Sequence, residues 1–206
     1  KPMTPRSRKS YIGWLGLVSH EFYHTWNVKR LRPKELGPFD YENENYTRSL
    51  WIAEGITSYY DDLMLIRAGL MTESEYLERL SKQLGYVEKS VGSRVQSLSD
   101  SSHDAWIKYY RQDENSPNTI TSYYSKGAAV AFLLDMALRR ATNERVSLDT
   151  LMKEAYVRFK TEGFTTEEFR TLTSELAGIS MDEFFAKFVD GTDALEHEPA
   201  LDWMGL

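Results

Sequence analysis

The sequence of 206 residues contains no cysteine. This excludes disulfide bonds, thiolate metal ligands and a cysteine nucleophile, so any metal or catalytic site must use other side chains. Acidic residues outnumber basic ones, 31 to 25, and the net charge of −6 argues against a surface for nucleic acid. The longest wholly apolar run, residues 128–134, is too short to cross a bilayer. We therefore expect neither a nucleic-acid partner nor a membrane span.

No secretory signal peptide is visible, and the sequence begins with lysine rather than with an initiator methionine. These features predict a piece of a longer protein and leave the compartment open, cytoplasmic or periplasmic. The hydrophobic content of 41% is sufficient for one globular domain with a substantial core.

Helical periodicity dominates the sequence, and no run of alternating strands with hairpin turns interrupts it. Segment 126–140 is apolar almost all round and predicts a buried central helix. Residues 31–47 and 90–119 are rich in proline, asparagine, serine and aspartate and predict irregular structure. The fold class predicted is mainly α.

Helix boundaries are also indicated by capping residues. Thr72-x-x-Glu75 and Ser180-x-x-Glu183 have the form of capping boxes, and each precedes apolar residues at helical spacing. Two glycines, Gly69 and Gly191, are expected to end helices.

The segment 18–33, VSHEFYHTWNVKRLRP, contains two histidines four residues apart. On an α-helix this spacing places His20 and His24 on one face, where both imidazoles can bind the same ion. Glu21 follows the first histidine and completes the pattern His-Glu-x-x-His. That pattern is typical of zinc peptidases, in which the glutamate is the general base for the attacking water. The segment therefore predicts two zinc ligands and a catalytic base.

A third protein ligand is expected, because catalytic zinc bound by two histidines needs at least one more. Residues 50–65, LWIAEGITSYYDDLML, place Glu54 among large apolar residues. Its carboxylate is either a solvated acid favoured by the helix dipole or an inward-facing group that needs a cation. The predicted ligand set is His20, His24 and Glu54, and one Zn²⁺ ion is the expected cofactor.

Four segments occur in a characteristic order over nearly the whole chain: HEFYHTWNVKRLRP, LWIAEGITSYYDDL, SLSDSSHDAWIKYYRQDENSPN and SYYSKGAAVAFLLDMALR. Together they resemble the glycyl aminopeptidase family of zinc peptidases. This family is related to thermolysin and to aminopeptidases of the leukotriene-hydrolase type, in which an Asn-Glu-Gly motif supplies the third zinc ligand. Glu54-Gly55 matches that motif in part, with Ala53 in place of asparagine. The longer separation from His24 would be absorbed by an insertion in loop 31–47.

The resemblance implies a thermolysin-like zincin fold, of which this sequence is the helical catalytic lobe. We expect residues 1–206 to form a single metallopeptidase catalytic domain. The family tends to have an N-terminal β-domain and a C-terminal PDZ domain, and we expect both to be absent from this fragment.

The resemblance also indicates an oxyanion donor. In the leukotriene-hydrolase relatives a Tyr-x-Lys-Gly motif supplies a phenol that hydrogen-bonds the tetrahedral oxyanion, and residues 124–127, YSKG, give Tyr124 that role. Such a donor stabilises the transition state more than the ground state. The alternative is a packed ring with a satisfied hydroxyl, since the sequence has 13 tyrosines. The adjacent Tyr123 is the second candidate.

Further side chains are candidates for contacts around the ligands. Zinc-binding histidines are usually oriented by a hydrogen-bond acceptor, and Asp61 or Asp62 could serve, although acids on a helix are more often simply solvated. Thermolysin-like sites often carry an aspartate one turn after the glutamate ligand, where this sequence has Ser58. His103 and His197 are expected to lie outside the site.

These residues predict peptide-bond hydrolysis with one zinc ion, with Glu21 as the proton carrier and Tyr124 as the oxyanion donor. The substrate partner would be a peptide. The resemblance implies an aminopeptidase that prefers small N-terminal residues such as glycine. A zinc endopeptidase is the alternative enzyme. A non-catalytic helical interaction domain with a vestigial metal site is the alternative from another class.

Overall fold

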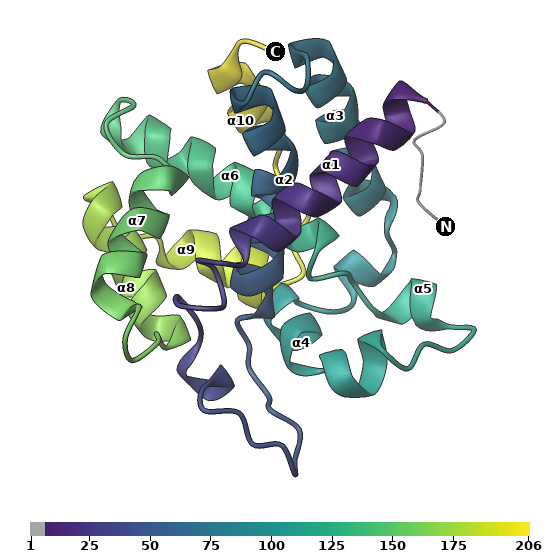
Figure 1. The fold of residues 1–206 in the computed structure, drawn as a ribbon, viewed down its shortest axis with the longest axis vertical. Coiled ribbons are helices and arrows are strands. Elements are labelled where there is room, and N and C mark those ends of the chain that lie inside the picture. The colour runs from purple at the N-terminus through teal and green to yellow at the C-terminus, as the bar shows by residue number, and fades with distance from the viewer. Residues whose placement is uncertain (1–6) are drawn as a thin grey trace.

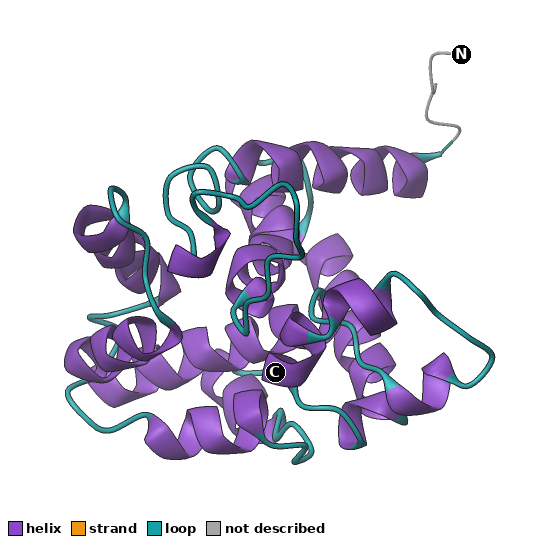
Figure 2. Ribbon diagram, turned by 90° about the horizontal axis from the view of Figure 1, so that it is seen from below, coloured by secondary structure: helices purple, strands orange, loops and turns teal. Residues whose placement is uncertain are grey.

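The computed structural model describes residues 7–206, and helices joined by loops make up this part of the chain (Figures 1 and 2). The α-helices are α1 (Arg8–Tyr23), α2 (Ile56–Arg67), α3 (Glu73–Lys89), α4 (Leu98–His103), α5 (Ser116–Thr119), α6 (Ser125–Thr142), α7 (Leu148–Phe159), α8 (Thr166–Ala177), α9 (Asp182–Phe185) and α10 (Glu198–Met204). The short 3-10 segments are η1 (Lys34–Leu36) and η3 (Gly92–Arg94), and the π-helical turns are η2 (Trp51–Gly55), η4 (Ala105–Tyr109) and η5 (Ala186–Asp190). No β-sheet forms among these residues, which confirms the mainly α prediction.

Helix α6 is the centre of the core. It is buried along most of its length, and α2, α3, α7, α8, α10 and η2 pack against it (Figure 1). A helix that is apolar all round can be stable only when other elements cover every face. The buried central helix predicted over 126–140 is therefore confirmed.

The two predicted capping boxes have different outcomes. Thr72 and Glu75 form the reciprocal pair of hydrogen bonds that begins α3, as predicted. The box at Ser180 is wrong, because α9 begins only at Asp182. Ser180 instead pairs with Asp182: its hydroxyl donates to the Asp182 carboxylate at 2.8 Å, and its oxygen accepts from the backbone N–H of Asp182 at 3.2 Å rather than from that of Glu183.

The predicted helix ends agree with the structure. Gly69 follows α2 with φ of 69°, a left-handed conformation that glycine adopts without a steric penalty. Gly191 follows η5 with extended backbone.

The prediction of irregular structure holds in one segment and fails partly in the other. Residues 31–47 form a loop that contains only η1. Residues 90–119 contain η3, α4, η4 and α5, each of six residues or fewer. Helices this short depend on tertiary packing, here of α4 against η5, and leave no periodic pattern in the sequence.

Helix α1 crosses the outside of the molecule and packs along α2 (Figure 1, purple). It carries five exposed large apolar residues, Tyr11, Trp14, Leu17, Val18 and Phe22. In residues 7–206 no helix combines the length and the apolar character needed to cross a bilayer.

Candidate metal centre

The three predicted metal ligands meet where the end of α1 contacts η2. His20 lies in the last turn of α1, His24 caps its C-terminus, and Glu54 lies in η2. The Nε2 atom of His20 is 3.1 Å from Nε2 of His24, and each Nε2 is 3.2 Å from Oε2 of Glu54. All three side chains are half-buried. In the part of the chain that the structure describes, no other group of three such residues converges in this way.

The hydrogen bonds of the two imidazoles decide which ring nitrogens face the centre. Nδ1 of His24 lies 2.9 Å from the carbonyl oxygen of Asn27, which can only accept, so this nitrogen carries the proton. Nδ1 of His20 likewise donates to Asp61, at 3.1 Å. Both Nε2 atoms therefore point at each other and at the Glu54 carboxylate. Three electron-rich atoms at these distances repel one another unless a cation lies between them.

The spacing of these atoms fits a metal ion. Ligands about 2.0–2.1 Å from zinc in a tetrahedral arrangement are roughly 3.3–3.4 Å apart. The observed separations of 3.1–3.2 Å are close to that value. Two imidazole nitrogens and one carboxylate oxygen form a ligand set that suits zinc.

The electrostatics of the cluster also favour a positive charge at its centre. Burial acts to lower the pKa of His20, but the carboxylates of Asp61 and Glu54 beside its two ring nitrogens outweigh this effect and raise the pKa to about 10. Burial acts to raise the pKa of Glu54, but its contacts with His20 and His24 prevail and lower the pKa to about 2. The Glu54 carboxylate is therefore negatively charged, and it favours a positive charge beside the two imidazole rings.

Of the three residues considered as partners of the ligands, the structure brings only one, Asp61, into contact with a histidine. Asp61 accepts a hydrogen bond from His20, while burial raises the pKa of this carboxyl to about 6. Asp62 instead accepts from Nε of Arg79 at 2.6 Å. Ser58 lies one turn after Glu54, and within residues 7–206 its side chain makes no hydrogen bond to either histidine. The acid that orients His20 is therefore Asp61, which lies two helical turns after the ligand Glu54.

Asn27 is a residue that the sequence analysis missed. Its carbonyl oxygen orients His24, and its buried amide donates to the carbonyl oxygens of Ile52 and Ala53 and to the hydroxyl of Thr57. These bonds fasten the chain after α1 to the π-helical turn that carries Glu54. The only signal in the sequence is an asparagine three residues after the second histidine, and no spacing rule covers it.

Two glycines bring the ligand-bearing turn against α6. A Cβ atom added at Gly55 would lie 2.6 Å from Cα of Gly127, and one added at Gly127 would lie 2.9 Å from Cα of Gly55. Both distances are shorter than real Cβ contacts, so the two backbones touch here only because neither residue has a side chain. This contact places the start of α6, and with it Tyr124, beside Glu54.

The two candidate tyrosines differ in exposure and direction. The ring of Tyr124 is half-buried, and its centre is 6.2 Å from that of His20. The ring of Tyr123 is 1% exposed, and its hydroxyl donates to Tyr110 at 3.1 Å. Burial is the largest cause that raises the pKa of Tyr124, and the charge of Glu54 adds to it. Tyr124 is thus the phenol next to the cluster.

The remaining predicted residues lie as follows. Glu21 is exposed on α1, directly after His20 in the chain. His103 contacts Asp104, and His197 directly precedes α10 near the C-terminus; neither joins the cluster.

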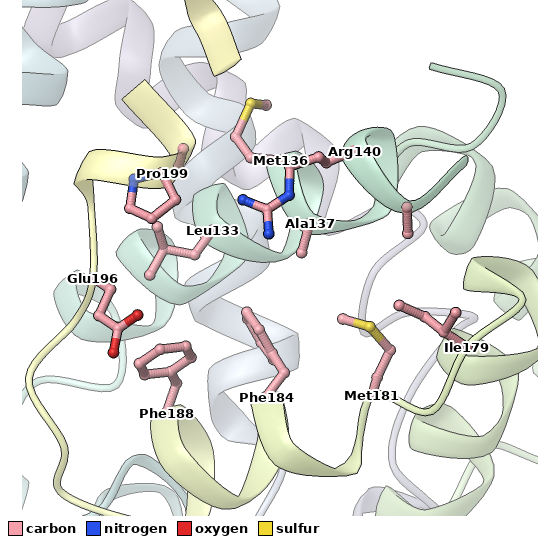
Figure 3. A pocket seen from close by; sticks show the side chains of 12 residues that line it. Leu133, Met136, Ala137, Arg140, Ile179, Met181, Phe184, Phe188, Glu196 and Pro199 are labelled. Atoms are coloured by element: carbon pink, nitrogen blue, oxygen red, sulfur yellow. The ribbon is translucent and has the colours of Figure 1, made fainter. Parts of the chain in front are cut away.

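A pocket of about 290 Å³ lies away from this centre, between α6, α9 and the segment that leads into α10 (Figure 3). Apolar side chains such as Leu133, Phe184 and Phe188 line it, together with the exposed Arg140 and Glu196. None of its lining residues belongs to the histidine and glutamate cluster.

The fold and the cluster together define a mainly helical protein with two histidines and a glutamate that could hold a metal ion. A family model described as M61 glycyl aminopeptidase matches residues 13–130 of the chain. Because the match covers more than half of the sequence, the chain belongs to this family.

A solved structure agrees with this assignment. The chain is similar to the crystal structure of the aminopeptidase N family protein from Idiomarina loihiensis, with a TM-score of 0.91 and 35% sequence identity. The similarity covers 98% of this chain and 35% of that protein, so the chain spans about a third of its length. No curated protein matches the sequence.

Proposed function

We propose that the chain is the catalytic part of a zinc-dependent aminopeptidase that removes small N-terminal residues such as glycine. The observation that carries this proposal is the convergence of His20, His24 and Glu54 within 3.2 Å of one another, next to an exposed glutamate. Membership of the glycyl aminopeptidase family supports the substrate class.

The residues of the site would have three roles in hydrolysis: metal ligand, proton carrier and hydrogen-bond donor to the oxyanion. His20, His24 and Glu54 would hold the zinc ion, which supplies a Lewis acid that acidifies water and polarises a carbonyl group. Glu21 takes a proton from the attacking water as the water oxygen bonds to the carbonyl carbon. It then delivers this proton to the amine nitrogen as the carbon–nitrogen bond breaks. Tyr124 donates a hydrogen bond to the carbonyl oxygen as negative charge develops there.

Metal content and a Glu21→Gln variant test the proposal. We expect about one zinc ion per chain in both proteins, and a 10²- to 10⁴-fold fall in turnover in the variant, since only the proton carrier is lost. Glu73→Gln, which changes an exposed acid on α3, is the matched control and should turn over normally. Near-normal turnover of Glu21→Gln would contradict the mechanism. A protein that binds no zinc would support the non-catalytic interaction domain.

The type of peptidase is tested with substrates. A screen of aminoacyl fluorogenic compounds should give the highest kcat/KM for the glycyl compound. Acetylation of the peptide N-terminus should abolish cleavage, because an aminopeptidase binds the free amine. Continued cleavage of the acetylated peptide would indicate the endopeptidase instead.

A further inference from the structure

A small cavity with a buried cation lies between the end of α3, η3, the start of α6 and the segment that leads into α10. Its volume is about 130 Å³. Lys126, with 1% of its surface exposed, is the most deeply buried of the charged residues that line it. None of the lining residues belongs to the histidine and glutamate cluster. The cavity is therefore a separate site, and we call it the Lys126 cavity.

The ammonium group of Lys126 has one hydrogen-bond partner within residues 7–206. Its Nζ donates to the carbonyl oxygen of Ser93 at 3.0 Å, although an ammonium group carries three N–H donors. No residue in this range forms an ion pair with Lys126, and the charge of Asp193 acts on it only from a distance. A buried charge without a paired counter-ion is costly, because it has lost its hydration. The ammonium group therefore favours an anion beside it.

The acceptor that holds the ammonium group is itself fixed in place. The hydroxyl of Ser93 lies 3.1 Å from that of Thr121, and both side chains are buried. The preceding Gly92 packs so closely against Ile120 that an added Cβ atom would lie 1.8 Å from the carbonyl oxygen of Ile120. Since η3 cannot move away, the position of the Lys126 ammonium group is set before any ligand binds.

A second polar group of the cavity lacks a partner. Nδ1 of His197 is buried and makes no hydrogen bond to the part of the chain that the structure describes. A neutral imidazole can donate a hydrogen bond from either ring nitrogen. The other charged residues that line the cavity, Glu88, Arg94 and Asp193, are all exposed and so lie nearer to solvent. The buried part of the lining therefore has one cation, one imidazole and no acid.

The size of the cavity limits what it can hold. A cavity needs about 10–15 Å³ to hold one water molecule, so 130 Å³ admits a small ion with part of its hydration shell. A nucleotide or a peptide is too large. We propose that the Lys126 cavity binds a small inorganic anion of the size of chloride, held by Lys126 with the imidazole of His197 beside it. The site is independent of the proposed function, and its occupancy is measurable without turnover.

Thermal unfolding in two sodium salts of equal ionic strength tests the proposal. Chloride at about 0.2 M should raise Tm by about 2–6 °C relative to gluconate, which is too large for the cavity, because a ligand of the folded state stabilises it. Lys126→Met should have the same Tm in both salts. Lys153→Met, which changes an exposed lysine on α7, is the matched control and should keep the difference. Equal Tm values for the unmodified protein, or a difference that Lys126→Met retains, overturn the proposal.

An NMR titration of the unmodified protein tests the site even if Lys126→Met fails to fold. In protein labelled with ¹⁵N at histidine, the imidazole signals of His197 are identified by their absence from His197→Gln. At constant pH, chloride should shift these signals along a curve that saturates, and gluconate should leave them in place. Signals that do not move, or that move without saturation, overturn the proposal. A bound anion also favours the charged form of the ammonium group, so pH titrations of Lys126 require chloride-free buffer.

Discussion

The carboxylate of Asp61 controls which nitrogen of His20 faces the centre. It accepts the Nδ1 proton at 3.1 Å, which leaves Nε2 free to bind a metal and holds the ring in the required orientation. The neighbouring Asp62 is bonded to Arg79 instead. Two adjacent acids on one helix therefore have separate roles.

This difference gives a first prediction. Asp61→Ala should weaken zinc binding about 10- to 100-fold, because His20 loses the acceptor that orients it. Asp62→Ala should leave the affinity for zinc almost unchanged. Competition with a coloured chelator measures both, after circular dichroism has established that each variant is folded. Equal affinities of Asp61→Ala and the unmodified protein would show that the orienting bond is dispensable.

The two adjacent tyrosines give a second prediction. Tyr124→Phe should lower kcat about 10²- to 10³-fold with little change in KM, since its hydroxyl is used only in the transition state. Tyr123→Phe should have a much smaller effect, because its hydroxyl points to Tyr110 and not to the metal cluster. Kinetics on a glycyl substrate decide between them. A large loss of kcat in the Tyr123 variant alone would move the oxyanion role to that residue.

Among the helices, the contact between η2 and α6 positions the site most directly. Glu54 precedes Gly55, and Tyr124 lies three residues before Gly127, so the glycine contact sets the separation of ligand and phenol. Any side chain at the crossing would separate the two backbones.

A third prediction follows from this crossing. Gly127→Ala should lower the free energy of unfolding by about 1–3 kcal/mol, as expected when an atom is forced into a filled contact. Gly85→Ala, on α3, is the matched control, because an added Cβ there meets nothing within 4 Å. It should leave stability unchanged or raise it by about 0.4–1 kcal/mol. Urea unfolding compares the two, and equal stabilities would mean that the backbones can separate without cost.

The sequence predicts those parts of the fold and site that depend on local rules. The i, i+4 histidines, the capping box at Thr72 and the apolar segment 126–140 all follow from helical geometry. The role of Asn27 depends on contacts with η2 and α2, which lie further along the chain, and no periodic pattern records such contacts. The short helices in 90–119 escape prediction for the same reason.

Across the chain, the buried ammonium group of Lys126 couples the stability of the core to pH. Lys126 is 1% exposed in α6, and its Nζ donates to the carbonyl oxygen of Ser93 at 3.0 Å. Burial lowers the pKa of Lys126 from 10.5 to about 8. Below that pH the group is charged in both the folded and the unfolded chain, and the folded state bears the unfavourable burial of the charge.

The last prediction is the sign and size of this coupling. Between about pH 8 and pH 10.5 the unfolded chain keeps the Lys126 proton that the folded chain has released, so the free energy of unfolding rises with pH. Relative to Lys126→Met, the unmodified protein should gain about 2 kcal/mol between roughly pH 7.5 and 9.5. Other titrating groups, including the buried tyrosines, contribute equally to both proteins and cancel in this difference. Urea unfolding at several pH values measures it, and a difference that stays constant with pH would show that the Lys126 amine keeps its ordinary pKa in the folded state.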